Sequence, residues 1–258
     1  MYKIQIADKY KSLTTFIESV PAIFDTSGQI IYQSRNVVKV FEVATSGIDK
    51  SVVRLNVKRY PPPRGINSIV YSISIRKPKG ARAFNNPSLL LERGIDTPEA
   101  VAYIEQRHGL LLGYSYFISL QSAYGHTMYE LRDAKEDEYE ALAIQFAAFT
   151  AEMHGKDILH LDYSPGNILF TKDDRGNYRF MLVDINRMRF GPVSMSMGLR
   201  SFRRLWGPKR FFVLVISEYS KLRGYEIKES VHYALKERER FWLHYLKKHP
   251  DSISNVEL

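Results

Sequence analysis

Residues 160–170, HLDYSPGNILF, hold the side chains best suited to chemistry. Asp162 precedes Asn167 by five positions across a turn-forming Ser-Pro-Gly, and the segment then runs into apolar sequence. A further carboxylate, Asp184, ends the apolar run YRFMLVDI. Carboxylate and amide oxygens are hard ligands of the kind that Mg²⁺ accepts, whereas a chain without cysteine or a His cluster does not suit a zinc site. The spacing therefore favours a magnesium-dependent site.

The surrounding pattern predicts elements that would bring these groups together. NILF and YRFMLVDI, separated by the turn TKDDRGN, are typical of a β-hairpin, which would return Asp184 to a place beside Asn167. The clearest helix pattern, EDEYEALAIQFAAFTAEMHGKD, precedes the loop, with acids at its start and Gly155 as its stop. From about Ser196 the pattern is mainly helical again.

The first hundred residues are rich in strand patterns. Short β-branched runs cover residues 28–34, 36–44 and 51–60, and the last of them ends at PPPRG. A helix is predicted over residues 81–93, where Pro87 would divide it into two short pieces, and further strands over residues 99–108 and 110–120.

Lys58 lies in the middle of the third of these strands. Val53, Leu55 and Val57 share one face by their period of two, so Lys58 belongs to the opposite face. A lysine in this setting is expected to reach toward an anion. The order Lys, Asp, Asn, Asp is that of phosphoryl-transfer enzymes.

These motifs resemble those of the protein-kinase-like superfamily. HLDYSPGNIL resembles the catalytic loop H-x-D-x-x-x-x-N, LVDIN the metal-binding D-F-G segment, and VKRY the lysine of the third strand of the N-terminal lobe. With IIYQSRNVVKVFE and RGIDTPEAVAYIE, the chain resembles the lipopolysaccharide core kinases, which phosphorylate Kdo or heptose, more closely than it resembles eukaryotic-type protein kinases. The resemblance covers about residues 28–204.

The resemblance implies a role for each matching residue. Asp162 would accept or orient the proton of the attacking sugar hydroxyl, with His160 supporting the loop through the backbone near Asp184. Asn167 and Asp184 would hold Mg²⁺ against the phosphates of ATP, and Lys58 would contact the α- and β-phosphates. The turn over the phosphates would be YQSRN, where the contacts would come from the consecutive residues Ser34, Arg35 and Asn36.

The sequence also departs from the protein-kinase pattern. It has no G-x-G-x-x-G and no A-P-E motif, and Leu161 replaces the arginine that couples the loop to a phosphorylated activation segment. DIN replaces D-F-G, which argues against a flipping segment. The acidic partner of Lys58 is open, because Asn85 or Asn86 falls at the expected position and Glu92 comes late in the helix.

The distribution of charge along the chain indicates which kinds of partner it could bind. Its formal net charge is +9, and residues 51–91 hold eight Lys and Arg without an acid, while residues 187–223 hold nine against a single Glu. Such blocks suit phosphate, nucleic acid or an anionic membrane face, and they equally suit a solvated surface. The start of the chain lacks the apolar core of a signal peptide, and its apolar runs are too short to span a bilayer. We therefore expect a cytoplasmic protein. The lipid A–core acceptor that the resemblance implies would make it peripheral at the inner face of the cytoplasmic membrane.

Together these patterns predict an α+β, two-lobed protein-kinase-like fold. Residues 1–120 would form a β-rich N-lobe with one helix, and residues 121–258 a mainly helical C-lobe, in one kinase-like domain. The resemblance implies ATP- and Mg-dependent phosphorylation of a sugar hydroxyl, on Kdo or heptose, of a lipid A–core glycolipid. The alternatives are a protein or small-molecule kinase, and a silent pseudokinase that binds nucleotide or a partner. A nucleic-acid-binding role would rest on charge alone, so no nucleic acid is expected.

Overall fold

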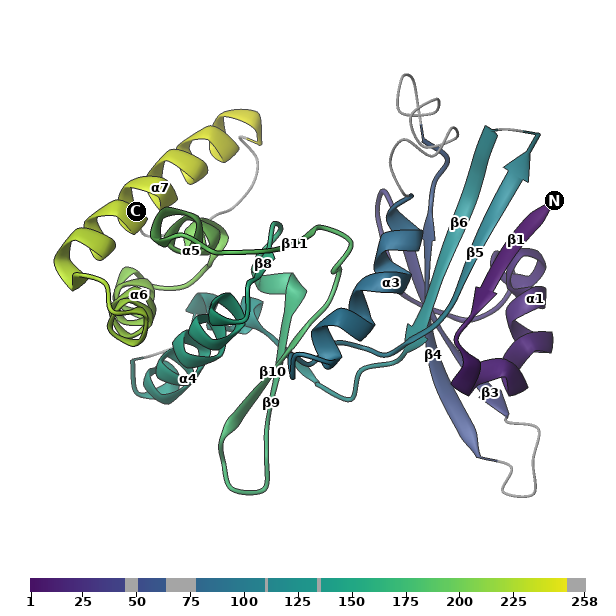
Figure 1. Cartoon of the computed structure of the whole chain (residues 1–258), viewed down its shortest axis with the longest axis horizontal. Helices are drawn as coiled ribbons and strands as arrows, with labels where there is room; N and C mark the ends of the chain where they lie inside the picture. The colour runs from purple at the N-terminus through teal and green to yellow at the C-terminus, as the bar shows by residue number, and fades with distance from the viewer. Residues whose placement is uncertain (45–50, 64–77, 110, 134–135, 250–258) are drawn as a thin grey trace. The chain divides into compact units, whose positions relative to one another are not determined.

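In a computed structural model, the chain forms two compact units, Met1–Ala123 and Tyr124–Leu258 (Figure 1). The structure describes residues 1–44, 51–63, 78–109, 111–133 and 136–249. The boundary expected from the sequence lay between residues 120 and 121, and the two units divide between Ala123 and Tyr124.

The first unit is built on a six-stranded sheet with the order β1-β5-β6-β4-β3-β2, in which every neighbouring pair is antiparallel. Its strands are β1 (Tyr2–Ile6), β2 (Gln29–Gln33), β3 (Val37–Ala44), β4 (Val52–Tyr60), β5 (Ala100–His108) and β6 (Leu111–Leu120). The strands predicted between residues 28 and 120 are all present, with boundaries that differ by at most one residue. The alternation of apolar and polar side chains therefore predicted the positions of strands β2 to β6.

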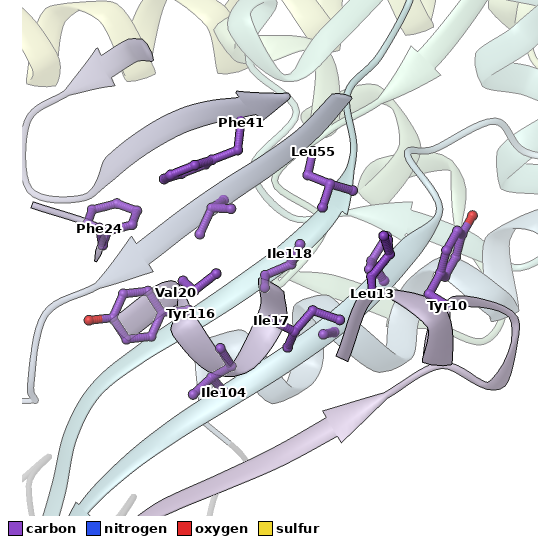
Figure 2. Packing of buried hydrophobic residues seen from close by; sticks show 13 residues of the cluster. Tyr10, Leu13, Ile17, Val20, Phe24, Phe41, Leu55, Ile104, Tyr116 and Ile118 are labelled. Carbon is purple, nitrogen blue, oxygen red and sulfur yellow. The ribbon is translucent and has the colours of Figure 1, made fainter. Parts of the chain in front are cut away.

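One face of the sheet carries the core of the first unit. Helix α1 (Thr14–Ile23) packs its buried Ile17 and Val20 against Leu55 and Val57 of β4, as Figure 2 shows for the wider cluster. The lysine Lys39 is also buried, and its Nζ donates to the carbonyl oxygens of residues 24 and 27, at 2.5 and 2.9 Å, just beyond the end of α1. A cation beyond the C-terminal end of a helix complements its dipole, and here it also satisfies carbonyls of the turn that follows the helix.

The opposite face of the sheet carries helix α3 (Lys79–Leu91), which packs on β5 and β6 (Figure 1). Lys58 pairs with Phe117 of β6, which in turn pairs with Tyr103 of β5, so all three side chains belong to this face. Gly80 is needed for the close approach of α3, because a Cβ there would lie 2.5 Å from the Tyr103 ring.

Two expectations for this unit need correction. The sequence predicted one helix, whereas the structure has α1 as well as α3, and β1 precedes them. The helix around Pro87 is continuous through Leu91 rather than divided, with the proline ring buried. Proline removes one backbone donor from a helix interior, and here the packing of α3 on the sheet keeps the helix intact.

The second unit is mainly helical and contains two small sheets. Its helices are α4 (Glu136–Gly155), α5 (Met195–Ser201), α6 (Lys209–Arg223) and α7 (Ile227–Lys248). One sheet has the order β10-β9-β7 and the other pairs β11 with β8. Their strands are β7 (His126–Thr127), β8 (Ile158–His160), β9 (Ile168–Lys172), β10 (Tyr178–Leu182) and β11 (Met188–Phe190).

Helix α4 is the central packing element of the second unit. It contacts α6, β8 and β10, and Gly155 is its last residue rather than the first residue beyond it. The buried Phe146 of α4 stacks on Tyr163 at 5.7 Å between ring centroids and meets Phe180 and Phe202 at 5.4 and 6.2 Å. This aromatic cluster joins α4 to the hairpin and to the loop that follows β8.

Candidate active site

The β9–β10 hairpin brings Asp184 beside Asn167, as the sequence predicted. Leu182 pairs with Ile168 at the open end of the hairpin, and the Val183 amide donates to the Asn167 carbonyl at 3.0 Å. Asp184 follows directly. The two residues are therefore fixed at adjoining ends of paired strands by backbone hydrogen bonds.

Asp184 has a strained backbone and a supported side chain. Its φ of 54° lies in the left-handed region, which costs a non-glycine residue free energy and often occurs at functional sites. The buried Asn186 donates from Nδ2 to Asp184 Oδ1. This hydrogen bond holds the carboxylate in place, and Asn186 is a supporting residue that the sequence analysis did not identify.

Asn167 is oriented by the loop that it ends. The loop closes with the 3₁₀ turn η3 (Pro165–Asn167), and Asn167 Nδ2 donates to the Asp162 carbonyl oxygen at 2.8 Å. With the amide nitrogen used in this way, Oδ1 is the atom of Asn167 that a cation would meet. Among the described residues, no group of three or more His, Cys, Asp or Glu side chains converges as a metal cluster would. The Asn167 and Asp184 oxygens suit a Mg²⁺ ion that takes its remaining ligands from water and phosphate.

His160 is buried at the end of β8 and joins two segments of the site. The Asp162 amide donates to Nδ1 at 3.0 Å, so Nε2 carries the proton and donates to the Val183 carbonyl at 3.2 Å. Burial lowers the pKa of His160, which keeps the ring neutral. The structure thus shows the backbone contact beside Asp184 that the sequence analysis assigned to this residue.

Asp162 has a guanidinium on each carboxylate oxygen. Arg187 Nη1 donates to Oδ2 at 3.2 Å, and Arg204 Nη1 donates to Oδ1. Arg187 follows Asp184 by three positions, and Arg204 ends the 3₁₀ turn η4 (Phe202–Arg204) after α5. Sequence motifs do not link these arginines to the site, although both lie in the basic block of residues 187–223.

Tyr163 anchors the loop to α4. Its ring is buried, and its hydroxyl lies 2.9 Å from Thr150 Oγ1 of that helix. Burial raises the pKa of the Tyr163 phenol, so the group remains protonated. Because Asp162 and Tyr163 are adjacent, this contact also fixes the backbone from which Asp162 projects.

The first unit holds the other residues that the sequence assigned to a site. Lys58 is half-buried, with Nζ 5.3 Å from the centroid of the Tyr60 ring. Helix α3 contains no acidic residue, and Glu92, which follows it, is exposed. The consecutive Ser34, Arg35 and Asn36 form the turn between β2 and β3, in which the Ser34 amide donates to the Asn36 carbonyl at 3.0 Å. Their roles toward a nucleotide stay predictions.

The segment of the chain that contains these second-unit residues matches the model of a known protein family. The model of the lipopolysaccharide kinase (Kdo/WaaP) family matches residues 64–191, a range that includes His160, Asp162, Asn167 and Asp184. The chain belongs to the lipopolysaccharide kinase (Kdo/WaaP) family. It is therefore an enzyme, a phosphotransferase of the kinase type.

A solved structure has a similar fold. The structure described as WaaP in complex with acyl carrier protein matches with a TM-score of 0.54 and 15% sequence identity, over 92% of this chain and 98% of that chain. This match confirms the predicted two-lobed kinase-like fold. A search of curated protein sequences found no match. Within the described part of the chain, no helix is long and apolar enough to cross a membrane.

Proposed function

We propose that the protein uses ATP and Mg²⁺ to phosphorylate a sugar hydroxyl, on Kdo or heptose, of the lipopolysaccharide inner core. Membership of the family supports a lipopolysaccharide kinase. The observation that carries the finer proposal is the loop between β8 and β9, which presents Asp162 and Asn167 while the hairpin delivers Asp184. A carboxylate for the hydroxyl and two oxygen ligands for a cation are the groups that phosphoryl transfer requires.

The chemistry of this reaction is a displacement at phosphorus. The acceptor hydroxyl oxygen forms a bond to the γ-phosphorus, the bond from that phosphorus to the bridging oxygen of ADP breaks, and the hydroxyl proton passes to the Asp162 carboxylate. Asp162 positions the hydroxyl, and His160 and Tyr163 hold the backbone from which Asp162 projects. Fixed positions of this kind supply most of the rate enhancement in phosphoryl transfer.

Asn167 Oδ1 and the Asp184 carboxylate would hold Mg²⁺, which neutralises charge on the phosphates when it is bound. In the first unit, we propose that Lys58 contacts the α- and β-phosphates and that the β2–β3 turn, with Ser34, Arg35 and Asn36, covers them. Support for Lys58 comes from its place in the middle of β4, on the face of the sheet that does not form the α1 core.

Activity measurements on single substitutions test this proposal. The assay is Mg-dependent transfer from ATP to a Kdo-containing lipid A precursor. Asp162→Asn is expected to lower kcat by about 10²- to 10⁴-fold, the usual contribution of a general base. Asp184→Asn should abolish turnover while retaining the fold, because asparagine tolerates the left-handed backbone. Asp174→Asn, an exposed residue of the hairpin turn, is the matched control.

The outcome separates this proposal from its main alternative. If the wild-type protein binds ATP but transfers phosphate to none of the lipid A–core acceptors, a nucleotide-binding pseudokinase is favoured. If it phosphorylates proteins or small alcohols in place of glycolipids, the alternative of a protein or small-molecule kinase is favoured. Mass spectrometry of the lipid A–core from cells with and without the protein would identify the phosphorylated sugar.

We also propose a cytoplasmic location, peripheral at an anionic membrane, where the lipid A–core acceptor lies. The support is the second basic block, in which Arg200 is exposed and Arg203 is half-buried. Neutralising Arg200, Arg203 and Arg204 should weaken binding to anionic liposomes, by about 1 kcal/mol for each basic residue near the surface. Because Arg204 also contacts Asp162, the double change Arg200→Gln with Arg203→Gln is the cleaner test. Unchanged liposome binding in that variant would disprove the basic-face proposal.

A further inference from the structure

The two arginines on Asp162 are unexpected for a residue that must receive a hydroxyl. Arg187 occupies Oδ2 at 3.2 Å and Arg204 occupies Oδ1. A carboxylate with a guanidinium on each oxygen has fewer lone pairs to offer to an incoming hydroxyl. The contacts of the structure therefore describe a state in which Asp162 is held by cations of its own chain.

The balance of charge at this cluster leaves it positive. Two guanidinium groups face one carboxylate, and Arg203 lies next to Arg204 along the chain. Burial is the main cause that lowers the pKa of Arg203; the positive charges of Arg200 and Arg204 add to it, and the carboxylates of Glu237 and Asp162 oppose it. A second anion is the group that would balance it.

The Arg187 backbone is held by a hydrogen bond, and the Arg204 guanidinium packs on an aromatic ring. Both side chains remain accessible to a ligand. The Arg187 carbonyl accepts from the Leu161 amide at 2.8 Å, and the Arg204 guanidinium lies 5.2 Å from the centroid of the Phe241 ring. Their side chains are 53% and 30% exposed. The planar guanidinium fork fits carboxylate and phosphate oxygens in pairs, so the cluster matches either acid group.

We propose that Arg187 and Arg204 form the subsite for an acid group of the acceptor, and that acceptor binding moves them from Asp162 to that group. The inference rests on the proposed function, since it concerns the acceptor of the same site. The substrate class is a sugar that carries a carboxylate or a phosphate near its reacting hydroxyl. A neutral sugar does not compete for the guanidinium groups, so Asp162 stays engaged.

Three acceptors distinguish the source of the acid group: a Kdo-containing lipid A precursor, the same precursor with the Kdo carboxylate converted to a carboxamide, and the precursor after removal of its phosphates. The wild-type enzyme is expected to lose about 10- to 100-fold in kcat/KM with one of the two altered acceptors, the range for a hydrogen bond to a charged group. The altered acceptor that shows the loss identifies the acid group as carboxylate or phosphate.

The arginine variants make the test specific to this subsite. Arg187→Gln and Arg204→Gln should lower kcat/KM for the intact precursor by a similar factor and show no further loss with the altered acceptor, as expected of coupled partners. Arg187 is the more exposed, so its variant should fold even if Arg204→Gln does not; thermal melting checks both. Arg175→Gln, an exposed arginine in the hairpin turn, makes the same charge change and should keep the full discrimination.

Two results would overturn the inference alone: equal wild-type activity on all three acceptors, or full discrimination retained in Arg187→Gln and Arg204→Gln. A wild-type enzyme that phosphorylates none of the acceptors would instead overturn the proposed function, and the inference with it. The two failures can be told apart. The inference fails in an enzyme that turns over, whereas the proposed function fails when no acceptor is phosphorylated.

Discussion

Acidification should destabilise the second unit through His154, in the last turn of α4. The side chain is buried, its Nδ1 lies 2.9 Å from the Tyr219 hydroxyl, and Nε2 has no hydrogen-bond partner among the described residues. Burial and, secondly, the positive charge of Arg223 lower the pKa of His154 to about 3. The folded protein therefore keeps this ring neutral at pH values where the unfolded chain would protonate it.

The magnitude follows from the two pKa values. The unfolded chain binds a proton below its ordinary pKa of 6.5, and the folded chain binds one only near pH 3. Stability is therefore highest above pH 6.5 and falls as the pH drops from 6.5 toward 3. Between pH 7 and pH 5, His154 alone should lower the free energy of unfolding by about 2 kcal/mol. For a chain of this length, that corresponds to a decrease in Tm of roughly 4–8 °C.

Denaturant unfolding at pH 7 and pH 5 tests this, with His154→Asn as the comparison. Asparagine keeps a hydrogen-bonding atom near the position of Nδ1 but does not titrate. The variant should lose about 2 kcal/mol less than the wild type between the two pH values. The lowered pKa of His160 acts in the same direction and is present in both proteins. His232→Asn, an exposed position on α7, controls for the substitution. An equal pH dependence in wild type and His154→Asn would refute the reasoning.

His160→Ala removes the bonds to the Asp162 amide and the Val183 carbonyl, so kcat in the transfer assay and stability in denaturant should both fall, the latter by about 2–4 kcal/mol; wild-type kcat would contradict its supporting role. Gly198→Ala places a Cβ 2.1 Å from the Tyr219 hydroxyl oxygen and should destabilise by about 1–3 kcal/mol, whereas Ser196→Ala on the same helix should not. Lys39→Met leaves the carbonyls at the end of α1 unsatisfied and should cost about 2 kcal/mol in urea unfolding, and an unchanged midpoint would argue against that cap.

The parts of the fold that were predictable carry local signals. Strands β2 to β6 alternate apolar and polar residues between Gly, Ser and Pro breaks, and the hairpin is marked by a turn-rich segment between two apolar runs. The placement of Asn167 beside Asp184 followed from that hairpin. The α1 segment, TTFIESVPAI, has weak signals, because threonines open it and Pro21 lies inside it. Burial of Ile17 and Val20 against the sheet outweighs these local preferences.

The contacts that complete the site depend on tertiary packing. Arg204 reaches Asp162 across 42 positions of the chain, and Tyr163 reaches Thr150 across 13. A periodic pattern shows which face of an element is buried, but it does not pair one arginine of a basic block with one particular carboxylate. The sequence therefore predicted which residue types form the candidate site, and the structure was needed to show that Asp162 is bound by arginines.

The anchoring of the segment around Asp184 has a consequence for inhibitor design. The β9–β10 pairing and the bond from Val183 to Asn167 fix it on one side. The β8–β11 pairing and the bond from Leu161 to Arg187 fix it on the other. Only residues 184–186 lie between these bonds. An inhibitor that displaces residues 184–186 would have to break one of these two strand pairings. Selective ligands should therefore fit the conformation that this segment has in the structure.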